Sequence, residues 1–484
     1  MRRNKVVKVG TSDFTRRNFL KTMGLGAAAF AVPMMGSFNY RRLDQYGGLE
    51  CLRFEATGFF RVEKADRWWL VTPGGSAFLS FGLNHMDTVY LLQDYNIDFW
   101  RTQFSFKDPS EPSFREGFVK KVMSDLNVFG MNTLGCHGKK EVFGKITVPY
   151  VQGLFFAPTA YWALRGVQSY PDVYSDEFRK RCEEIAENIC LPKVNDPFLI
   201  GYTFTNVPIL TDLDADAHGM VPWGAPQDQR PTWPRALRNR GPETAGKKVF
   251  VDLMQKRYPT ILEFNQNYGT GFNTFSELLN AVNWSPFEKI EKINDAADNH
   301  AFMLDIYEQY YRVTCQAIKQ FDPNHLLFGD PLNANTGTTD DIVTLVARHI
   351  DLISYQYYGP YSDQSHVLDH WSALTGKPIF NTDSNFTVPY EQMPNPVGWI
   401  CKTEEERASY FLDFATRAFA RPDFIGWNWC GWIDAWESWR PVQQHCGLQD
   451  PFGNYHHPMP KVMSTFGSQL YDYALGKRKS LKIG

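Results

Sequence analysis

The stretch GYTFTNVPIL, residues 201–210, joins an unbroken apolar run to a polar end. The run begins slightly earlier, as FLIGYTFTN (198–206), and such a segment is typical of a strand that is buried on both faces. Seven further segments have the same form, each a short apolar run that ends in polar or aromatic residues. They are FLSFGLNH (78–85), MNTLGCHG (131–138), YVQGLFFAP (150–158), HLLFGDPLN (325–333), LISYQYYGP (352–360), PIFNTDSNF (378–386) and FIGWNWCGW (424–432).

Helix-compatible segments separate most of these runs. Residues 112–130 and 404–421 carry apolar side chains at helical spacing. Eight buried parallel strands alternating with helices are what a (β/α)8 barrel requires. An open, doubly wound sheet would give a similar alternation, but the chain has no glycine-rich nucleotide loop to support it. The sequence therefore predicts an α/β fold, a (β/α)8 TIM barrel.

Two segments fall outside the strand–helix repeat. FFRVEKADRWWLVTPGG (59–75) predicts a short N-terminal β-hairpin with a Pro-Gly-Gly turn. More than a hundred residues separate Asn206 from His325; residues 211–246 predict a large loop, and 247–284 and 299–325 predict helices. We expect one barrel domain over residues 50–475, with this loop and helical insertion after the fourth strand.

Composition excludes some classes of partner. Charged residues make up 21% of the chain and the net charge is -3, so nothing favours binding to a nucleic acid or a membrane surface. Aromatic residues reach 15%, and flat rings serve both apolar cores and the faces of sugars. The eight cysteines form no pattern with metal-ligand spacing, so the sequence predicts neither a metal nor another cofactor.

The first residues resemble an export signal. TRRNFLKTMGLGAAAFAVPMMG contains the pair Arg16-Arg17 followed by a short apolar run. This pattern is typical of a twin-arginine signal, and the apolar run is too short to span a bilayer. We expect residues 1–36 to be the signal and the mature protein to be periplasmic or secreted, with no membrane attachment after cleavage.

Polar and aromatic residues cluster at the ends of the eight runs, where a barrel carries its chemistry. Hydrogen-bonding groups, carboxylates and flat rings together suit a neutral, polyhydroxylated ligand better than a phosphate or a metal. The residues are Asn84, His85, Asp87, His137, Asn206, Asp330, Asn333, Tyr355, Gln356, Tyr357, Tyr358, Asp383, Asn385, Trp427, Asn428, Trp429, Asp434, Trp436 and Glu437.

Several segments in order resemble a known clan. The likeness covers nearly the whole mature chain. It is carried by the entry hairpin with FLSFGLN, then by PFLIGYTFTN, QKRYPTILEFNQNYGTGFNTFSEL, GKPIFNTDSNF and FIGWNWCGWIDAW…GLQDPFGNYHHPMP. The chain resembles the (β/α)8 clan of retaining glycoside hydrolases, most of all the β-agarases of family 50 and the related β-galactosidases.

The resemblance implies roles for individual positions. Such enzymes place a Glu acid/base on the fourth strand and a Glu nucleophile on the seventh, about 5–5.5 Å apart. By position, Asn206 matches the residue that binds the sugar 2-hydroxyl, Val207 falls on the acid/base and Asp383 on the nucleophile. The tyrosine that orients the nucleophile corresponds to Tyr355 or Tyr357, and the sugar platform to Trp427 or Trp429.

Both catalytic positions depart from this pattern. Asp383 keeps a carboxylate, but on a side chain one methylene shorter than Glu. Val207 can neither give nor take a proton. The ordinary double displacement cannot run on these two residues.

Three interpretations remain open. In the first, an active hydrolase uses Asp383 with a relocated acid, supplied by Asp87, Asp212, Asp214, Asp216, Asp330, Asp434 or Glu437. In the second, an inactive protein of the same fold binds glycan through its Trp and Asn residues. In the third, a Tyr/His pair drawn from Tyr355, Tyr357, His85 and His137 performs an elimination.

The retained carboxylate favours the first interpretation. The resemblance then implies an exported glycoside hydrolase that acts on a galactan-type, agar- or porphyran-like, poly- or oligosaccharide. The expected catalytic residues are Asp383, Asp330, Asp434 and Glu437, and the expected substrate-binding residues are Asn84, His85, His137, Asn206, Tyr355, Tyr357, Trp427, Trp429 and Trp436.

Overall fold

The computed structural model describes residues 42–138, 142, 145–157, 170–204, 232–285, 294–333, 338–437 and 444–483. The predicted export signal, Asn206, Val207 and the loop carboxylates Asp212, Asp214 and Asp216 lie outside these residues. All eight cysteines lie within them, and each is a free thiol. No helix in the described ranges has both the length and the apolar character needed to cross a membrane.

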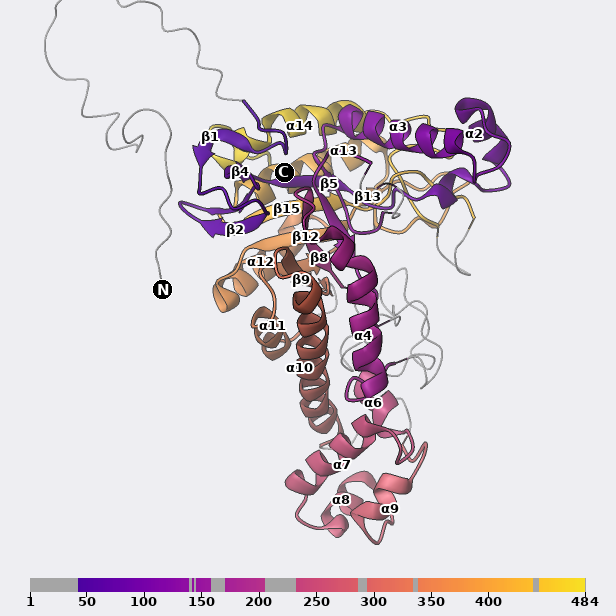
Figure 1. Ribbon diagram of the computed structural model, residues 1–484, viewed down its shortest axis with the longest axis vertical. Helices are drawn as coiled ribbons and strands as arrows, with labels where there is room; N and C mark the ends of the chain where they lie inside the picture. Colours follow the sequence, from indigo (N-terminus) through magenta and orange to yellow (C-terminus); the bar gives the residue numbers. More distant parts are fainter. Residues whose placement is uncertain are drawn as a thin grey trace, which may run out of the picture.

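Parallel strands form a nearly closed barrel, and each of the eight predicted strand positions holds a strand. The order in the sheet is β10-β11-β12-β15-β5-β6-β7-β8-β9. The predicted TIM barrel is therefore confirmed (Figure 1). The strands are β5 (Ser80–Leu83), β6 (Thr133–Leu134), β7 (Tyr150–Gly153), β8 (Leu199–Thr203), β9 (Leu326–Gly329), β10 (Leu332–Asn333), β11 (Ile353–Gln356), β12 (Ile379–Ser384) and β15 (Phe424–Trp429).

The fifth barrel position is divided between two short strands. β9 pairs with β8, and β10 pairs with β11, so the bend at residues 330–331 carries the chain from one edge of the sheet to the other. Gly329 enters this bend with φ 71°, a conformation that a side chain would strain. A Cβ at this position would also lie 2.8 Å from the hydroxyl of Tyr311. The bend therefore requires glycine.

Helices cover the outside of the barrel, as the apolar periodicity predicts. α3 has a proline in its first turn and ends at Gly130 in the left-handed region, while the side chain of Thr403 caps the start of α13. The helices outside the insertion are α2 (Ile97–Phe104), α3 (Pro112–Phe129), α4 (Asp176–Ile189), α11 (Asp340–Ala347), α12 (Tyr361–Thr375), α13 (Glu404–Ala420) and α14 (Met459–Ala474), with 3-10 turns at Thr88–Leu91 and Leu191–Lys193.

The N-terminal segment forms a larger sheet than the predicted hairpin. Four antiparallel strands lie in the order β1-β4-β3-β2, with bounds β1 (Leu49–Arg53), β2 (Arg61–Lys64), β3 (Trp68–Val71) and β4 (Ser76–Phe78). The Pro-Gly-Gly turn joins β3 to β4 rather than β2 to β3. Buried Arg67 donates to the carbonyls of Phe419 and Phe424, which fastens this sheet to the start of β15.

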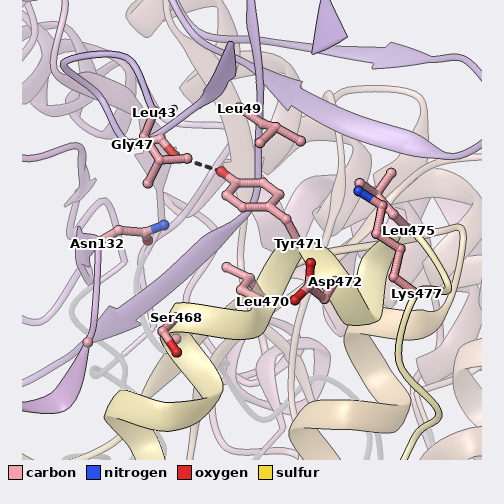
Figure 2. Close-up of a pocket in the computed structure, with 12 residues that line it drawn as sticks. Leu43, Gly47, Leu49, Asn132, Ser468, Leu470, Tyr471, Asp472, Leu475 and Lys477 are labelled. Carbon is pink, nitrogen blue, oxygen red and sulfur yellow. Dashed lines mark hydrogen bonds between the residues drawn. The ribbon is translucent and has the colours of Figure 1, made fainter. Parts of the chain in front are cut away.

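A cavity lies at this same end of the molecule, between the N-terminal segment and α14 (Figure 2). Leu43, Asn132 and Tyr471 line it, and the Tyr471 hydroxyl donates to the Gly47 carbonyl at 2.7 Å. Asn132 immediately precedes β6, so the cavity lies at the starts of the barrel strands. It is therefore far from the strand ends that carry the candidate site residues.

The insertion after the fourth strand projects away from the barrel. α4 and α10 (Asp295–Phe321) pack on each other and run side by side, with α7 to α9 at their far end (Figure 1). A short helix, α6 (Trp233–Arg238), falls within the segment predicted as loop, so that part of the prediction was wrong. The other helices are α7 (Ala245–Arg257), α8 (Ile261–Tyr268) and α9 (Phe275–Asn280), and the small β13 (Phe386–Thr387) and β14 (Trp399–Ile400) pair elsewhere.

Buried ion pairs hold α6 to α10 within this insertion. Arg235 and Arg238 of α6 both contact Asp295 at 2.5 Å and 2.7 Å, and all three side chains are fully buried. Arg238 also donates to Asn299 and to Ser285. Charges removed from water need such partners, so the base of the insertion depends on one carboxylate that serves two guanidinium groups.

Candidate active site

Asp383 lies at the C-terminal end of β12 with both carboxylate oxygens engaged. Asn84 donates from Nδ2 to Oδ1 at 2.6 Å, and the Tyr358 hydroxyl donates to Oδ2 at 2.8 Å. The side chain is only 6% exposed. These contacts fix the carboxylate at the end of the barrel where such folds carry their active sites.

Asn84 reaches Asp383 through the barrel interior. It follows β5, which pairs with β15, and β15 pairs in turn with β12. A side chain at Gly135 would collide with Asn84, and one at Gly82 would collide with Asn428 of β15. The two glycines therefore clear the space in which the amides of Asn84 and Asn428 lie.

Three histidines surround the carboxylate. The rings of His85 and His137 stack with centroids 4.7 Å apart and planes 11° apart, and His445 meets His85 edge-on at 4.3 Å. His85 Nε2 lies 3.8 Å from Asp383 Oδ1. The backbone of His85 has φ 60°, a left-handed conformation that is uncommon outside glycine and that clusters at functional sites.

The charge state of the site follows from these contacts. Burial alone would raise the pKa of Asp383, but the neighbouring His85, His137 and Asn84 outweigh it and hold the pKa well below its usual range. Burial, followed by the charge of His85, lowers the pKa of His137 to about 4. Near neutral pH His137 is therefore uncharged, Asp383 is ionised, and His85 and Asn84 are the groups that stabilise the carboxylate there.

The tyrosine that donates to the Asp383 carboxylate is neither of the two that the sequence predicted for this role. The hydroxyl that contacts Asp383 belongs to Tyr358, whereas the Tyr355 hydroxyl donates to Gln364 of α12 at 2.9 Å and so points into the helical layer. Tyr357 is half-buried. β11 ends at Gln356, so the strand alternation no longer fixes the direction of the residues that follow.

Trp427 and Trp429 do not form a sugar platform. Both are fully buried; Trp427 stacks on Phe411 of α13 at 5.5 Å, and Arg407 of α13 lies over the Trp429 ring at 5.4 Å. Successive strand residues point to opposite faces, so Asn428 between them points into the barrel. Neither polar atom of the Asn428 side chain has a partner among the described residues, which leaves both for a bound ligand or water.

Trp436 lies at the rim of the barrel and is partly exposed. Its indole lies tilted against the Tyr95 ring, with centroids 5.2 Å apart, and donates to the Tyr390 hydroxyl at 2.7 Å. The predicted binding role of this partly exposed ring remains a proposal.

The other candidate carboxylates in the described ranges are either hydrogen-bonded within the protein or exposed to solvent. Asp434 is fully buried and is held by Tyr390, His456 and the Gly447 backbone amide, and Glu437 is exposed. Asp330 is fully buried under α10, where Tyr307 and Tyr310 donate to it at 3.0 Å and 3.4 Å. Burial raises the pKa of Asp330 to about 7 despite these hydroxyls.

Asp330 should make stability depend on pH. Its folded-state pKa of about 7 lies above the 3.8 of an ordinary aspartate, so the folded protein holds the proton more tightly than the unfolded chain does. The free energy of unfolding is therefore highest below the unfolded pKa and falls as the pH rises towards 7. At about 1.4 kcal/mol per pH unit, raising the pH from about 5 to about 8 should cost the wild type on the order of 2–3 kcal/mol. Asp330→Asn should lose less over the same interval, measured by urea unfolding at the two pH values. Parallel losses in the two proteins would contradict the assignment.

Eight parallel strands carry a fixed carboxylate and hydrogen-bonding amides at their C-terminal ends, which is where barrel enzymes hold their active sites. The resemblance expected from sequence is confirmed. The chain is 21% identical to β-agarase B of Vibrio sp. (strain JT0107) over 88% of its own length and 50% of that protein. It is likewise 21% identical to β-agarase A of the same strain, over 81% of its own length and 44% of that protein.

Solved structures share the fold. An exo-β-agarase superposes with a TM-score of 0.71 at 16% identity, covering 90% of this chain and 68% of that one. A β-galactosidase from Bacillus circulans sp. alkalophilus superposes with a TM-score of 0.51 at 12% identity, covering 82% of this chain and 56% of that one. No protein-family model matches the chain. The chain thus spans about half the length of the curated β-agarases that it resembles.

Proposed function

We propose that the protein is a glycoside hydrolase that acts on an agar-type galactan, with Asp383 as the reacting carboxylate. The observation that carries the proposal is the state of Asp383, which is ionised, buried at a strand end and held by Asn84 and Tyr358. The likeness to β-agarases supports the substrate class. The unpartnered side-chain amide of Asn428, which lies near that of Asn84 at Gly135, adds hydrogen-bonding capacity inside the barrel.

The carboxylate suits attack on an anomeric carbon. A retaining enzyme needs an ionised nucleophile that is oriented by hydrogen bonds, and Asp383 meets both conditions. Because the Asp383 side chain is one methylene shorter than that of Glu, the anomeric carbon must lie closer to the end of β12 than in an enzyme with a Glu nucleophile.

The proton donor must come from elsewhere than residue 207. Of the candidate carboxylates in the described ranges, Asp330 and Asp434 are held by tyrosines, and Glu437 is exposed. The Asp87 side chain caps the 3-10 turn at Thr88–Leu91, where it accepts from the Val89 backbone amide at 2.8 Å. We therefore assign the acid to Asp212, Asp214 or Asp216, which belong to the segment that follows β8, the strand on which the clan carries its acid.

Product analysis tests this function. The protein is incubated with agar, porphyran and carrageenan, and new reducing ends are quantified while the anomer released first is read by NMR. Products from agar or porphyran with retained configuration support Asp383 as nucleophile. Inverted products would instead make Asp383 the base for a water molecule, with the carboxylates about 6.5–9.5 Å apart.

A second candidate function is glycan binding without cleavage. The observation that favours it is the isopropyl side chain of Val207 at the clan's acid position. Binding to agar oligosaccharides with no products from any of the polysaccharides would establish this function and refute hydrolysis.

We also propose export through the twin-arginine route, on the basis of Arg16-Arg17 and the apolar run that follows. Replacing both arginines by lysine should retain the protein in the cytoplasm. Cell fractionation followed by immunoblotting measures this, and an unchanged exported fraction would contradict the route.

A further inference from the structure

The histidines around Asp383 form a group that could bind a metal ion. One ligand atom from each of His85, His137 and Asp383 lies within 4.8 Å of the others, and His85 Nε2 is 3.8 Å from Asp383 Oδ1. A second group of the same size joins His85 to His445 and Cys430. These residues come from five different segments of the chain, so the barrel assembles a cluster that no local spacing shows.

Three buried ring nitrogens of this cluster have no hydrogen-bond partner in the part of the chain that the structure describes. His137 Nε2 is buried and has no hydrogen-bond partner among the described residues, and neither ring nitrogen of His445 meets one at hydrogen-bonding geometry. His325 shows how a structural histidine is satisfied in the same protein: Nδ1 lies 2.6 Å from Asp322 and Nε2 lies 2.9 Å from the Asp196 carbonyl. Buried polar atoms without partners need a ligand or water, so the cluster differs from an ordinary core histidine.

We propose that the barrel mouth binds one divalent transition-metal ion of the zinc class through His85, His137 and Asp383, with His445 beside the open position. Two imidazole nitrogens and one carboxylate oxygen suit zinc and its neighbours, whereas calcium and magnesium prefer oxygen ligands alone. Tetrahedral ligands about 2.0–2.2 Å from zinc lie roughly 3.3–3.6 Å from one another, close to the present 3.8 Å.

The surroundings support the proposed ligands. Asn84 and Tyr358 orient Asp383 from two sides, as outer partners do for carboxylates that ligate metals. The stacked rings of His85 and His137 must turn apart to point at one ion. His85 has the freedom to turn, because its side chain remains 22% exposed.

The proposal does not depend on hydrolysis. The same oxygen of Asp383 would ligate the metal and attack the sugar, so an occupied metal site and a glycosyl-enzyme at Asp383 exclude each other. Metal binding therefore has to be measured directly and not through activity, and its failure would leave the proposed hydrolase untouched.

The test uses the full chain, purified without a histidine tag and dialysed against a chelator. Zinc uptake is measured by calorimetry and by elemental analysis, and cobalt supplies a visible spectrum that reports the ligands. We expect one equivalent of zinc per chain. We expect His137→Gln and Asp383→Asn to weaken binding by more than the roughly 10–100-fold that loss of an outer partner costs.

A matched control separates this site from incidental binding by surface histidines. His300 contacts Asp341 at 2.5 Å on the exposed surface, so His300→Gln removes a His–Asp pair outside the barrel mouth and should leave zinc affinity unchanged. Circular dichroism verifies that each variant is folded. No stoichiometric uptake by the wild type, or equal affinity in folded His137→Gln and Asp383→Asn, would overturn the proposal.

Discussion

Asp383→Asn should lower the rate of agar hydrolysis by a factor on the order of 10³ or more, while glycan affinity stays within a few-fold of wild type. Asn has nearly the same shape as Asp, and its one oxygen can still accept the hydrogen bond from Tyr358, although the bond from Asn84 to the other oxygen is lost. The neutral amide cannot form the covalent bond to the sugar that an ionised carboxylate forms. Initial rates of reducing-end release and calorimetry with agar oligosaccharides measure the two effects separately.

Two further variants make this result specific. Asp340→Asn changes a carboxylate on the exposed surface and should leave the rate unchanged. Tyr358→Phe keeps the carboxylate but removes one donor, so we expect a smaller loss, about 10–100-fold. Release of reducing ends by Asp383→Asn at the wild-type rate would exclude this residue from the reaction. Products that absorb in the ultraviolet would then favour the elimination interpretation.

Asp295→Ala should destabilise the protein by about 3–5 kcal/mol. The change removes the carboxylate that both Arg235 and Arg238 contact, and it leaves two guanidinium groups buried without that partner. The hydrogen bonds from Arg238 to Asn299 and Ser285 are too few to replace it. Urea unfolding measures the loss, and limited proteolysis shows whether residues 232–285 become accessible first.

The control is an ion pair of the same length on the surface. Arg101 and Asp98 also lie 2.7 Å apart, but their side chains are 42% and 88% exposed. Asp98→Ala should therefore cost less than about 1 kcal/mol, because solvent screens such pairs. Equal effects of Asp98→Ala and Asp295→Ala would show that burial does not set the strength of the inner pair.

The barrel was predictable because its physical signal is local. A parallel strand covered on both faces must be apolar throughout, so each strand appears as a short apolar run, and all eight positions were found. The structure shortens most of these runs, since their polar ends belong to the loops that carry the site. The helix α6 was missed because its six residues lie among prolines and charges that normally indicate a loop.

The directions of side chains at the site were less predictable. Asp383, Asn84, His85 and His137 do come together, because the ends of parallel strands meet at one end of a barrel. Which of two adjacent residues enters the site depends on the face of the strand to which its side chain points. A strand that is apolar on both faces has no polar–apolar alternation from which that direction can be predicted. Tyr358 therefore makes the contact that was assigned to Tyr355 or Tyr357, and Asn428 points into the barrel in place of the tryptophans beside it.

The position of His445 at the site could not be predicted from the sequence either. It lies 360 positions after His85 in the chain, yet the two rings are in contact. Nothing in the residues around His445 resembles a site, and only the closure of the barrel brings it there. A single sequence carries no local signal for such a contact.

The burial of Trp427 and Trp429 decides what optical spectroscopy can report. Both indoles lie in the wall between the barrel and α13, out of reach of dissolved quenchers such as iodide. Their emission monitors the integrity of this wall. The half-buried ring of Trp436 lies at the rim, where a bound saccharide would alter its emission. Of the fourteen tryptophans, these three therefore report on two different events: Trp427 and Trp429 on unfolding of the wall, and Trp436 on occupancy of the rim.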